Sequence, residues 1–321
     1  MTQASISIGL SAAIVSVEKE NPSALVVARA DSEDALPFGP FDPQSQRTLE
    51  QGLRKWVGEQ TRFDLGYTEQ LYTFGDRGRH LPTAQPDDAN GTRVVSVGYL
   101  ALTRQGEDDA GKRETRWRPW YHYFPWEDWR DAKPRMIDAT ILPRLKSFVK
   151  SGASAQAAEL RRERVRLSFG VDGVAWDEEK VLERYELLYE AGLVEEARRD
   201  SGKSASRNES EMLGAAMMYD HRRILATAIA RLRGKMKYRP VVFELMAPSF
   251  TLLELQRTVE ALQGRRLHKQ NFRRLVAEQG LVEGTGKFAA SARGRPAELF
   301  HFRREVLRER PAPGLRLGIR R

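Results

Sequence analysis

The sequence contains no cysteine among its 321 residues. This absence excludes disulfide bridges and cysteine-ligated zinc, and it is typical of an intracellular protein. No apolar run approaches the roughly 20 residues that span a bilayer, so we expect no membrane helix. The alternation of Ile6, Ile8 and Leu10, with no basic segment before it, predicts a strand instead of a signal peptide. We therefore expect a cytoplasmic protein.

Several catalytic signatures are also missing. Residues 281–288 fail the phosphate-binding loop pattern, because Leu281 replaces the first glycine and Phe288 replaces the Ser or Thr. There is no Gly-x-Ser-x-Gly motif and no internal repeat. The histidines lack metal-ligand spacing; they are His80, His122, His221, His268 and His301. The sequence thus predicts no metal site.

The positive charge is concentrated at one end of the chain. The whole sequence has 53 Lys and Arg against 44 Asp and Glu, a formal net charge of +9. Residues 248–321 contain 16 Lys and Arg and 7 Asp and Glu, so they account for the entire excess. A neutral body with a small basic domain is typical of a protein that binds a polyanion, because neutralising phosphates releases counterions. The alternative is a basic solvated tail, which would lack a fold pattern.

The basic segment does have a fold pattern. It contains a helix over 250–262, a turn at Gln263 and Gly264, a helix over 268–280, and alternating strands over 281–288 and 297–304. Thr251 and Glu254 form a capping-box pattern, and Phe272, Leu275 and Val276 give the second helix an inner face. This order predicts a winged helix-turn-helix, whose second helix enters the major groove of DNA and whose hairpin lies along the backbone or minor groove.

The outer face of the second helix has the chemistry to read bases. Gln and Asn form bidentate pairs with adenine, and Arg forms them with guanine. The alternative for any single arginine is a solvated side chain. The predicted DNA contacts are Arg266, Lys269, Gln270, Asn271, Arg273 and Arg274 on and beside this helix, and Lys287, Arg293 and Arg295 on the hairpin.

The N-terminal half alternates strand and helix patterns. Strands are predicted over 5–17, 23–30, 67–75 and 93–103, and an amphipathic helix over 48–61. A β-hairpin, a glycine-containing loop, a helix and further strands in this order resemble the Nudix fold. That fold is an α/β/α sandwich and is usually a pyrophosphohydrolase of nucleoside diphosphates linked to another group. The alternative is a different α/β layer.

The resemblance weakens at the positions that hold the Nudix metal. When Arg54 is aligned with the signature arginine, Lys55 and Gly58 occupy positions of helix glutamates, and only Glu59 remains acidic. Gln46 stands eight residues before Arg54, where the signature has a glutamate. A lysine beside a cation site repels Mg²⁺. We therefore expect no catalytic residues and no hydrolase activity.

Several longer strings resemble a regulator family. Residues 71–76, 93–102 and 220–240, together with the winged-helix strings, are similar to the NrtR group of Nudix-related regulators of NAD metabolism. The long insertion in the middle is closer to the related NadQ repressors. The resemblance implies a homodimeric transcriptional repressor of NAD biosynthesis genes. It further implies a palindromic double-stranded operator and an effector that is NAD, ADP-ribose or ATP, with no required cofactor.

The expected architecture follows from these patterns. The fold class is α+β, a degenerate Nudix-like α/β/α sandwich over residues 1–235 followed by a winged helix-turn-helix over 240–321. An aromatic insertion occupies about 104–210, with a helix over 177–192, an exposed loop over 197–210 and a long helix over 211–234 after it. Two rival functions remain: an active Nudix pyrophosphohydrolase of ADP-ribose-type substrates, and a nucleic-acid-binding architectural protein without a ligand.

The aromatic insertion has two interpretations. Four tryptophans fall within 13 residues: Trp117, Trp120, Trp126 and Trp129. Their rings either stack on adenine, with Arg116 and Arg118 at the phosphates, or close the core or a dimer seam. The candidate ligand-binding residues are Arg54, Tyr72, Arg93, Tyr99, Arg116, Trp117, Arg118 and Trp120.

Overall fold

The computed structural model describes residues 6–28, 33–61, 63, 65–76, 93–104, 115–201, 213–289 and 296–315. The N-terminal part contains β1 (Ile6–Glu18), β2 (Asn21–Val27), β3 (Phe38–Pro40), α1 (Leu49–Thr61), β4 (Tyr67–Phe74), β5 (Arg93–Leu102) and β6 (Thr115–Pro119). The middle contains α2 (Trp120–Tyr123), η1 (Pro125–Glu127), η2 (Ile137–Ile141), α3 (Leu142–Lys150), α4 (Ala155–Phe169), α5 (Val181–Glu190), α6 (Glu195–Asp200) and α8 (His221–Lys235). None of the described helices is long and apolar enough to cross a membrane.

One mixed sheet organises the N-terminal half. Its strand order is β4-β5-β1-β2-β6, with β3 paired to β1. The long strand β1 runs parallel to β5, and the other pairs are antiparallel. Lys19 and Glu20 form the two-residue turn between β1 and β2, and both have positive φ, at 46° and 66°. A turn of this kind matches the twist of the strands that it joins.

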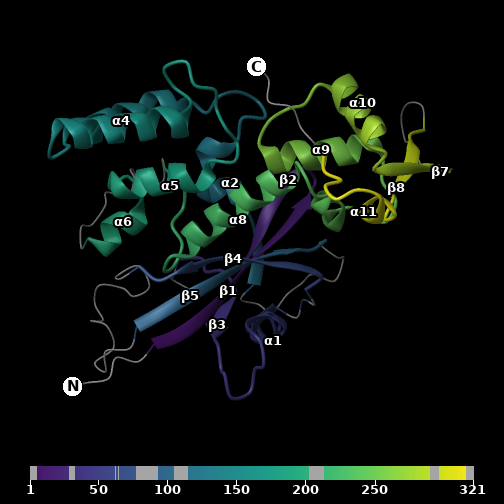
Figure 1. Ribbon diagram of the computed structural model, residues 1–321, viewed down its shortest axis with the longest axis horizontal. Coiled ribbons are helices and arrows are strands. Elements are labelled where there is room, and N and C mark those ends of the chain that lie inside the picture. The colour runs from purple at the N-terminus through teal and green to yellow at the C-terminus, as the bar shows by residue number, and fades with distance from the viewer. Residues whose placement is uncertain are drawn as a thin grey trace.

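The alternation of side chains along β1 creates two separate cores. Leu10, Ala12 and Ile14 point to one face and pack with α1, while Ala13 and Val15 point to the other. Figure 1 shows α1 below the sheet and the helices α2, α5 and α8 above it. The predicted α/β/α sandwich is therefore confirmed, and its strand and helix bounds lie close to the predicted ones.

The aromatic insertion forms core. Trp120, Tyr123, Phe124 and Trp126 are all 0% exposed and belong to the larger hydrophobic cluster, above the sheet. The guanidinium of the buried Arg222 on α8 lies 5.4 Å from the Phe124 ring and 5.5 Å from the Trp126 ring. The structural interpretation of these tryptophans thus agrees with their burial.

Two predictions on the segment before α8 were wrong. Residues 197–200 belong to α6 and are helical; residues 202–210 lie outside the described part of the chain. The long helix begins at His221 instead of residue 211, because Gly214 and Tyr219 have φ values of 84° and 53° that a right-handed helix does not allow. The helix predicted from residue 177 begins at Val181.

The C-terminal part is a winged helix-turn-helix, as predicted. It contains η3 (Val241–Leu245), α9 (Leu252–Gln263), α10 (Lys269–Gln279), β7 (Val282–Phe288), β8 (Glu298–Phe302) and α11 (Val306–Glu309). Thr251 and Glu254 form the predicted capping box. Gly264 and Gly280 end the two helices in the left-handed conformation, at φ 72° and 54°. Helix α9 packs against β1, β2 and α8, so the winged helix rests on the body (Figure 1).

Candidate nucleic-acid interface

The recognition helix α10 divides its residues cleanly between core and solvent. Phe272 and Val276 are 2% and 1% exposed and anchor the helix to α9 and the wing strands. Four predicted DNA contacts of this helix are exposed: Lys269, Gln270, Asn271 and Arg273. Lys269 and Arg273 are four residues apart, one helical turn, and line the same hollow.

Three of the predicted cationic contacts have no ion-pair partner within the described part of the chain. Neither Lys269 nor Arg273 forms an ion pair or side-chain hydrogen bond with the described residues. Arg274 pairs with Glu278 one turn later, at 2.9 Å, and both are exposed. Lys287 on β7 is exposed and has no ion-pair partner in the described ranges. Arg293 and Arg295 lie outside the described residues.

A hollow of about 550 Å³ lies between the recognition helix and the wing. Its lining includes Lys269 and Arg273 of α10, Leu253 of α9, and Phe288 and Phe300 of the wing. Leu253 and Phe288 are 49% and 61% exposed. Cationic and apolar side chains therefore meet at the same surface.

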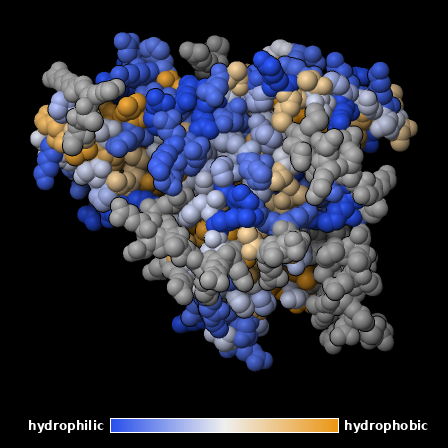
Figure 2. Space-filling view, turned by 180° about the vertical axis from the view of Figure 1, so that it is seen from behind, coloured by the Kyte–Doolittle hydropathy of each residue, from blue (hydrophilic) through white to orange (hydrophobic). Residues whose placement is uncertain are grey.

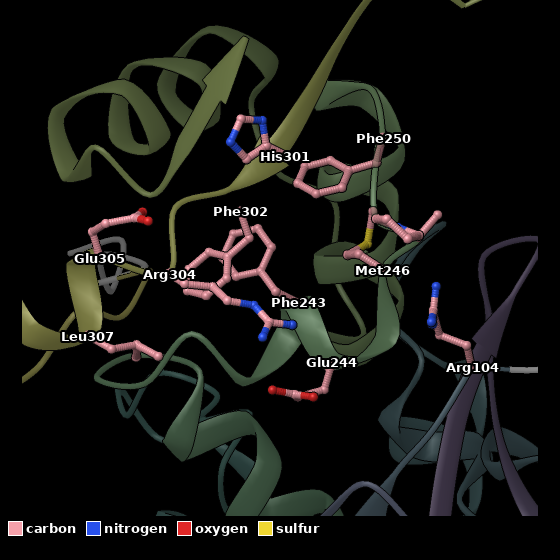
Figure 3. A pocket seen from close by; sticks show the side chains of 12 residues that line it. Arg104, Phe243, Glu244, Met246, Phe250, His301, Phe302, Arg304, Glu305 and Leu307 are labelled. Carbon is pink, nitrogen blue, oxygen red and sulfur yellow. The ribbon is translucent and has the colours of Figure 1, made fainter. Parts of the chain in front are cut away.

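A second hollow, of about 690 Å³, adjoins the wing strand β8. Figure 3 shows Phe243 and Phe302 at its centre, and their rings stack at 4.3 Å. Arg104 reaches it from the end of β5, and Arg304 from the segment after β8. The winged helix and the body therefore border this hollow together.

Arg266 differs from the other predicted DNA contacts. Its guanidinium pairs with Glu260 of α9 at 3.1 Å and with Glu20 of the β1–β2 turn at 3.3 Å. Arg257 of α9 pairs with the same Glu20 carboxylate at 3.0 Å. The turn of the sheet is therefore held by two arginines of the winged helix, and Arg266 is already engaged in that contact.

A buried ion-pair cluster, formed by Glu127, Arg184 and Arg233, joins the aromatic insertion to the winged helix. The Glu127 carboxylate pairs with Arg184 of α5 at 2.6 Å and with Arg233 of α8 at 2.7 Å, and all three residues are at most 1% exposed. Removing charges from water costs several kcal/mol for each ion unless hydrogen bonds satisfy them. Arg184 meets this requirement by donating to the carbonyls of Ser168 and Asp177, both at 2.9 Å.

The same cluster holds the end of α9. The last carbonyls of a helix have no partner within it. Arg233 Nε donates to the Leu262 carbonyl at 2.8 Å, Tyr121 Oη to Ala261 at 2.7 Å, and the Trp129 amide to Gly264 at 2.7 Å. Sequence reasoning missed this link, because Glu127 lies 57 and 106 residues from the two arginines. The body thus fixes the turn that leads into the recognition helix.

The predicted ligand residues on β6 do not share one surface. Arg116 and Arg118 both lie within 3.3 Å of Asp34, which is 7% exposed and also accepts a 2.6 Å hydrogen bond from Tyr123 Oη. Burial and the Asp34 carboxylate raise the pKa of Tyr123, so it stays a donor. Trp117 points to the opposite face and packs edge-on against Phe63 at 5.8 Å.

The remaining predicted ligand residues are also dispersed. Trp120 is enclosed in the core, where its ring cannot stack on a ligand. Arg54 is held by Glu50 and the carbonyls of residues 65 and 66. Tyr99 is 4% exposed and donates to Gln70 at 3.3 Å, whereas Tyr72 is 62% exposed. The Arg93 side chain lies outside the described atoms. The structure therefore does not combine the eight residues into one pocket.

The aligned Nudix metal positions are divided between core and surface. Gln46 is 5% exposed, and its Oε1 accepts the Asp42 amide at 3.0 Å, so it closes the loop before α1. Lys55, Gly58 and Glu59 are exposed on α1. Among the described residues there is no group of three or more His, Asp or Glu that could hold a metal ion.

Residues 242–302 match the family model described as the NrtR DNA-binding winged helix domain. The chain is also 41% identical over 86 residues to the "ADPR responsive transcriptional repressor NtrR" of Acinetobacter baylyi. That match covers 27% of this chain and 34% of the relative, so the alignment spans about a third of the relative's length. The resemblance to the NrtR group is therefore confirmed for the winged-helix domain.

Solved structures extend the likeness to the whole fold. NrtR of Shewanella oneidensis superposes with a TM-score of 0.54 at 20% identity, covering 93% of this chain and 95% of that one. The same protein in complex with a 27mer DNA superposes with a TM-score of 0.50 at 22% identity, covering 93% and 94%. At these identities the likeness shows the fold alone: a Nudix-like domain followed by a winged helix.

Proposed function

We propose that this chain is a transcriptional repressor of the NrtR type that binds double-stranded DNA through α10 and the wing. One observation carries the proposal: on the helix that a winged helix-turn-helix presents to the major groove, Lys269 and Arg273 stand exposed without partners in the described structure. Unpartnered cations beside amide side chains suit phosphates and base edges. The match to the NrtR winged-helix model supports the same function.

The Nudix-like body is the proposed sensor, and ADP-ribose is its leading effector. The similarity to a repressor named as ADPR responsive favours ADP-ribose over NAD and ATP. An effector changes DNA binding only if it binds one arrangement of the two domains better than another. The buried ion-pair cluster and the Glu20 contact supply a physical connection between the sensor and the recognition helix.

The operator is proposed to be palindromic and the repressor a homodimer. Two winged helices related by a two-fold axis read two half-sites about one helical turn apart, or a multiple of it. NAD biosynthesis genes are the proposed targets, on the basis of the family resemblance. A cytoplasmic location follows from this function.

The function is tested by selecting bound sequences from a randomised duplex library with the full chain. We expect enrichment of one palindromic motif, and we expect ADP-ribose to change the dissociation constant for a duplex of that motif. Arg273→Ala should weaken binding to this duplex, whereas Arg162→Ala on the distant helix α4 serves as a charge-matched control. Selection of no motif by the wild-type chain contradicts the proposal.

The body is proposed to be catalytically inactive. The aligned metal positions hold Gln46, Lys55 and Gly58, and a lone Glu59 gives Mg²⁺ a single carboxylate. We expect no appreciable hydrolysis of ADP-ribose with Mg²⁺. Phosphate-release measurements check this: turnover of about 1 per second or more that is lost on Glu59→Gln identifies an active Nudix enzyme instead.

A further inference from the structure

The wing exposes an aromatic ring beside the recognition helix. Phe288, at the end of β7, is 61% exposed, and no other phenylalanine among the described residues is among the exposed large hydrophobic side chains. Figure 2 shows hydrophobic residues over the wing, at the edge of the molecule. Phe288 is paired across the hairpin with Glu298, which lines the same hollow. A large ring left in water loses the stabilisation that burial would give.

The position of this ring relative to the cations indicates its partner. Phe288 lines the same hollow as Lys269 and Arg273, and Lys287 precedes it in the strand. The charged side chains that line the hollow are Lys269, Arg273 and one carboxylate, Glu298, so a partner that reaches the ring meets a net positive charge. A duplex does so, because its phosphates meet the cations while its sugars and base edges offer apolar surface in the grooves.

We propose that Phe288 is a specificity-determining residue that packs into the minor groove flanking the sequence read by α10. This inference rests on the proposed DNA-binding function. A phenyl ring carries no charge and cannot pair with base edges, so it distinguishes sequences only by how easily the groove opens. Pyrimidine–purine steps such as TA and CA are the most deformable, and apolar wedges are found at such unstacked steps. Phe288 therefore selects for deformable steps outside the central motif.

Two adjacent residues provide a matched test. Phe288→Ala removes the ring without a change of charge, and Lys287→Ala removes a charge next to it. Binding of both variants to the duplex selected by the wild-type chain is measured by fluorescence anisotropy at several salt concentrations. We expect Phe288→Ala to weaken binding roughly tenfold, as for one aromatic contact with a nucleic acid, and to leave the salt slope unchanged. Lys287→Ala should reduce the salt slope by about 1.

A second measurement examines sequence preference directly. The selection from the randomised library is repeated with Phe288→Ala and with Phe288→Trp. We expect the central motif to persist with both variants and the preference for flanking steps to disappear only with alanine. Leu160→Ala, an exposed apolar residue of α4, controls for loss of apolar surface, and equal melting temperatures confirm that the variants are folded.

The outcomes separate the two proposals. If the wild-type chain selects a motif but Phe288→Ala keeps both its affinity and its flanking preference, the role of the ring is wrong and the DNA-binding function stands. If the wild-type chain selects no motif, the function itself fails, and this inference fails with it.

Discussion

The arginines of the buried ion-pair cluster and those of the recognition helix lie in opposite environments. Arg184 and Arg233 are 0% exposed, and each guanidinium has a carboxylate and two or more carbonyls or hydroxyls as partners. Arg273 is exposed and has no ion-pair partner in the described part of the chain. The same side chain therefore serves two purposes: a fully paired one fixes the domains, and an unpaired one is available to a polyanion.

Breaking the buried ion-pair cluster should have the largest effect on stability. Glu127→Gln leaves two buried arginines facing a neutral amide, and loss of one partner of a buried pair costs about 3 to 5 kcal/mol. Denaturant unfolding should show this loss in the free energy of unfolding. Glu163→Gln, in the exposed pair with Arg166, should change it by less than about 1 kcal/mol. If both variants lower the free energy of unfolding by the same amount, the buried cluster stabilises the fold no more than an exposed ion pair does.

Removing an unpaired arginine should affect binding but not stability. Arg273→Ala is expected to weaken binding to the selected duplex by about 1 to 3 kcal/mol if it reads a guanine. The free energy of unfolding should stay within about 0.5 kcal/mol of the wild type, as for an ordinary surface position. Arg274→Ala should weaken DNA binding less, since Arg274 must first leave Glu278. Unchanged affinity for both variants moves the DNA surface elsewhere.

Arg266 is intermediate between the buried, paired arginines and the exposed, unpaired Arg273. Glu20→Gln removes a carboxylate that pairs with Arg257 and Arg266, all of them partly exposed. The free energy of unfolding should fall by about 0.2 to 1 kcal/mol, as for surface pairs. DNA affinity should rise slightly at low salt, because the carboxylate no longer competes with phosphates for Arg266. A titration at two salt concentrations checks this, and weaker DNA binding would show that the Glu20 contact orients the winged helix for DNA.

The smallest expected effect concerns a carboxyl group of the body. Burial raises the pKa of Glu33 to about 7, with Glu196 and Glu195 adding to the rise and Arg199 opposing it. A carboxyl group whose pKa is raised by folding binds its proton more tightly in the folded state. The free energy of unfolding therefore falls as the pH increases from about 4.5 towards 7. Glu33→Gln should flatten this fall in melting temperature and match the wild type near pH 4. If Glu33→Gln leaves the dependence of the melting temperature on pH unchanged, Glu33 is not the group that causes it.

The sequence predicted the elements whose signals are local. The capping box at Thr251 and Glu254, the glycine at 264 and the alternation along β1 each arise from neighbouring residues, and the structure confirms them. The buried ion-pair cluster was not predicted, because it joins residues 57 and 106 positions apart in the sequence. A partial signal exists on α8. Arg222 and Arg233 lie on the same face as the buried Ala226 and Ile229.

The candidate ligand residues show a different limit of prediction from sequence. Arg116, Trp117 and Arg118 were grouped because they are adjacent in sequence, yet consecutive residues of a strand point to opposite faces. Once β6 is recognised as a strand, alternation separates Trp117 from the two arginines. Burial of Trp120 depends on α8 and the middle helices, which are distant in sequence. Local density of aromatic residues therefore did not indicate accessibility.

Gly264 has a consequence for domain exchange. A Cβ atom at this position would collide with the Glu127 carbonyl and stand 2.9 Å from Tyr121 Oη and 3.0 Å from Arg233 Nη2. A side chain at position 264 would therefore force the winged helix and the body apart at this contact. A chimera that keeps this body, with the Glu127 carbonyl, must also keep a glycine at the matching position of the winged helix. The fit between the body and the winged helix thus depends in part on a backbone position that contacts neither effector nor DNA in the proposed mechanism.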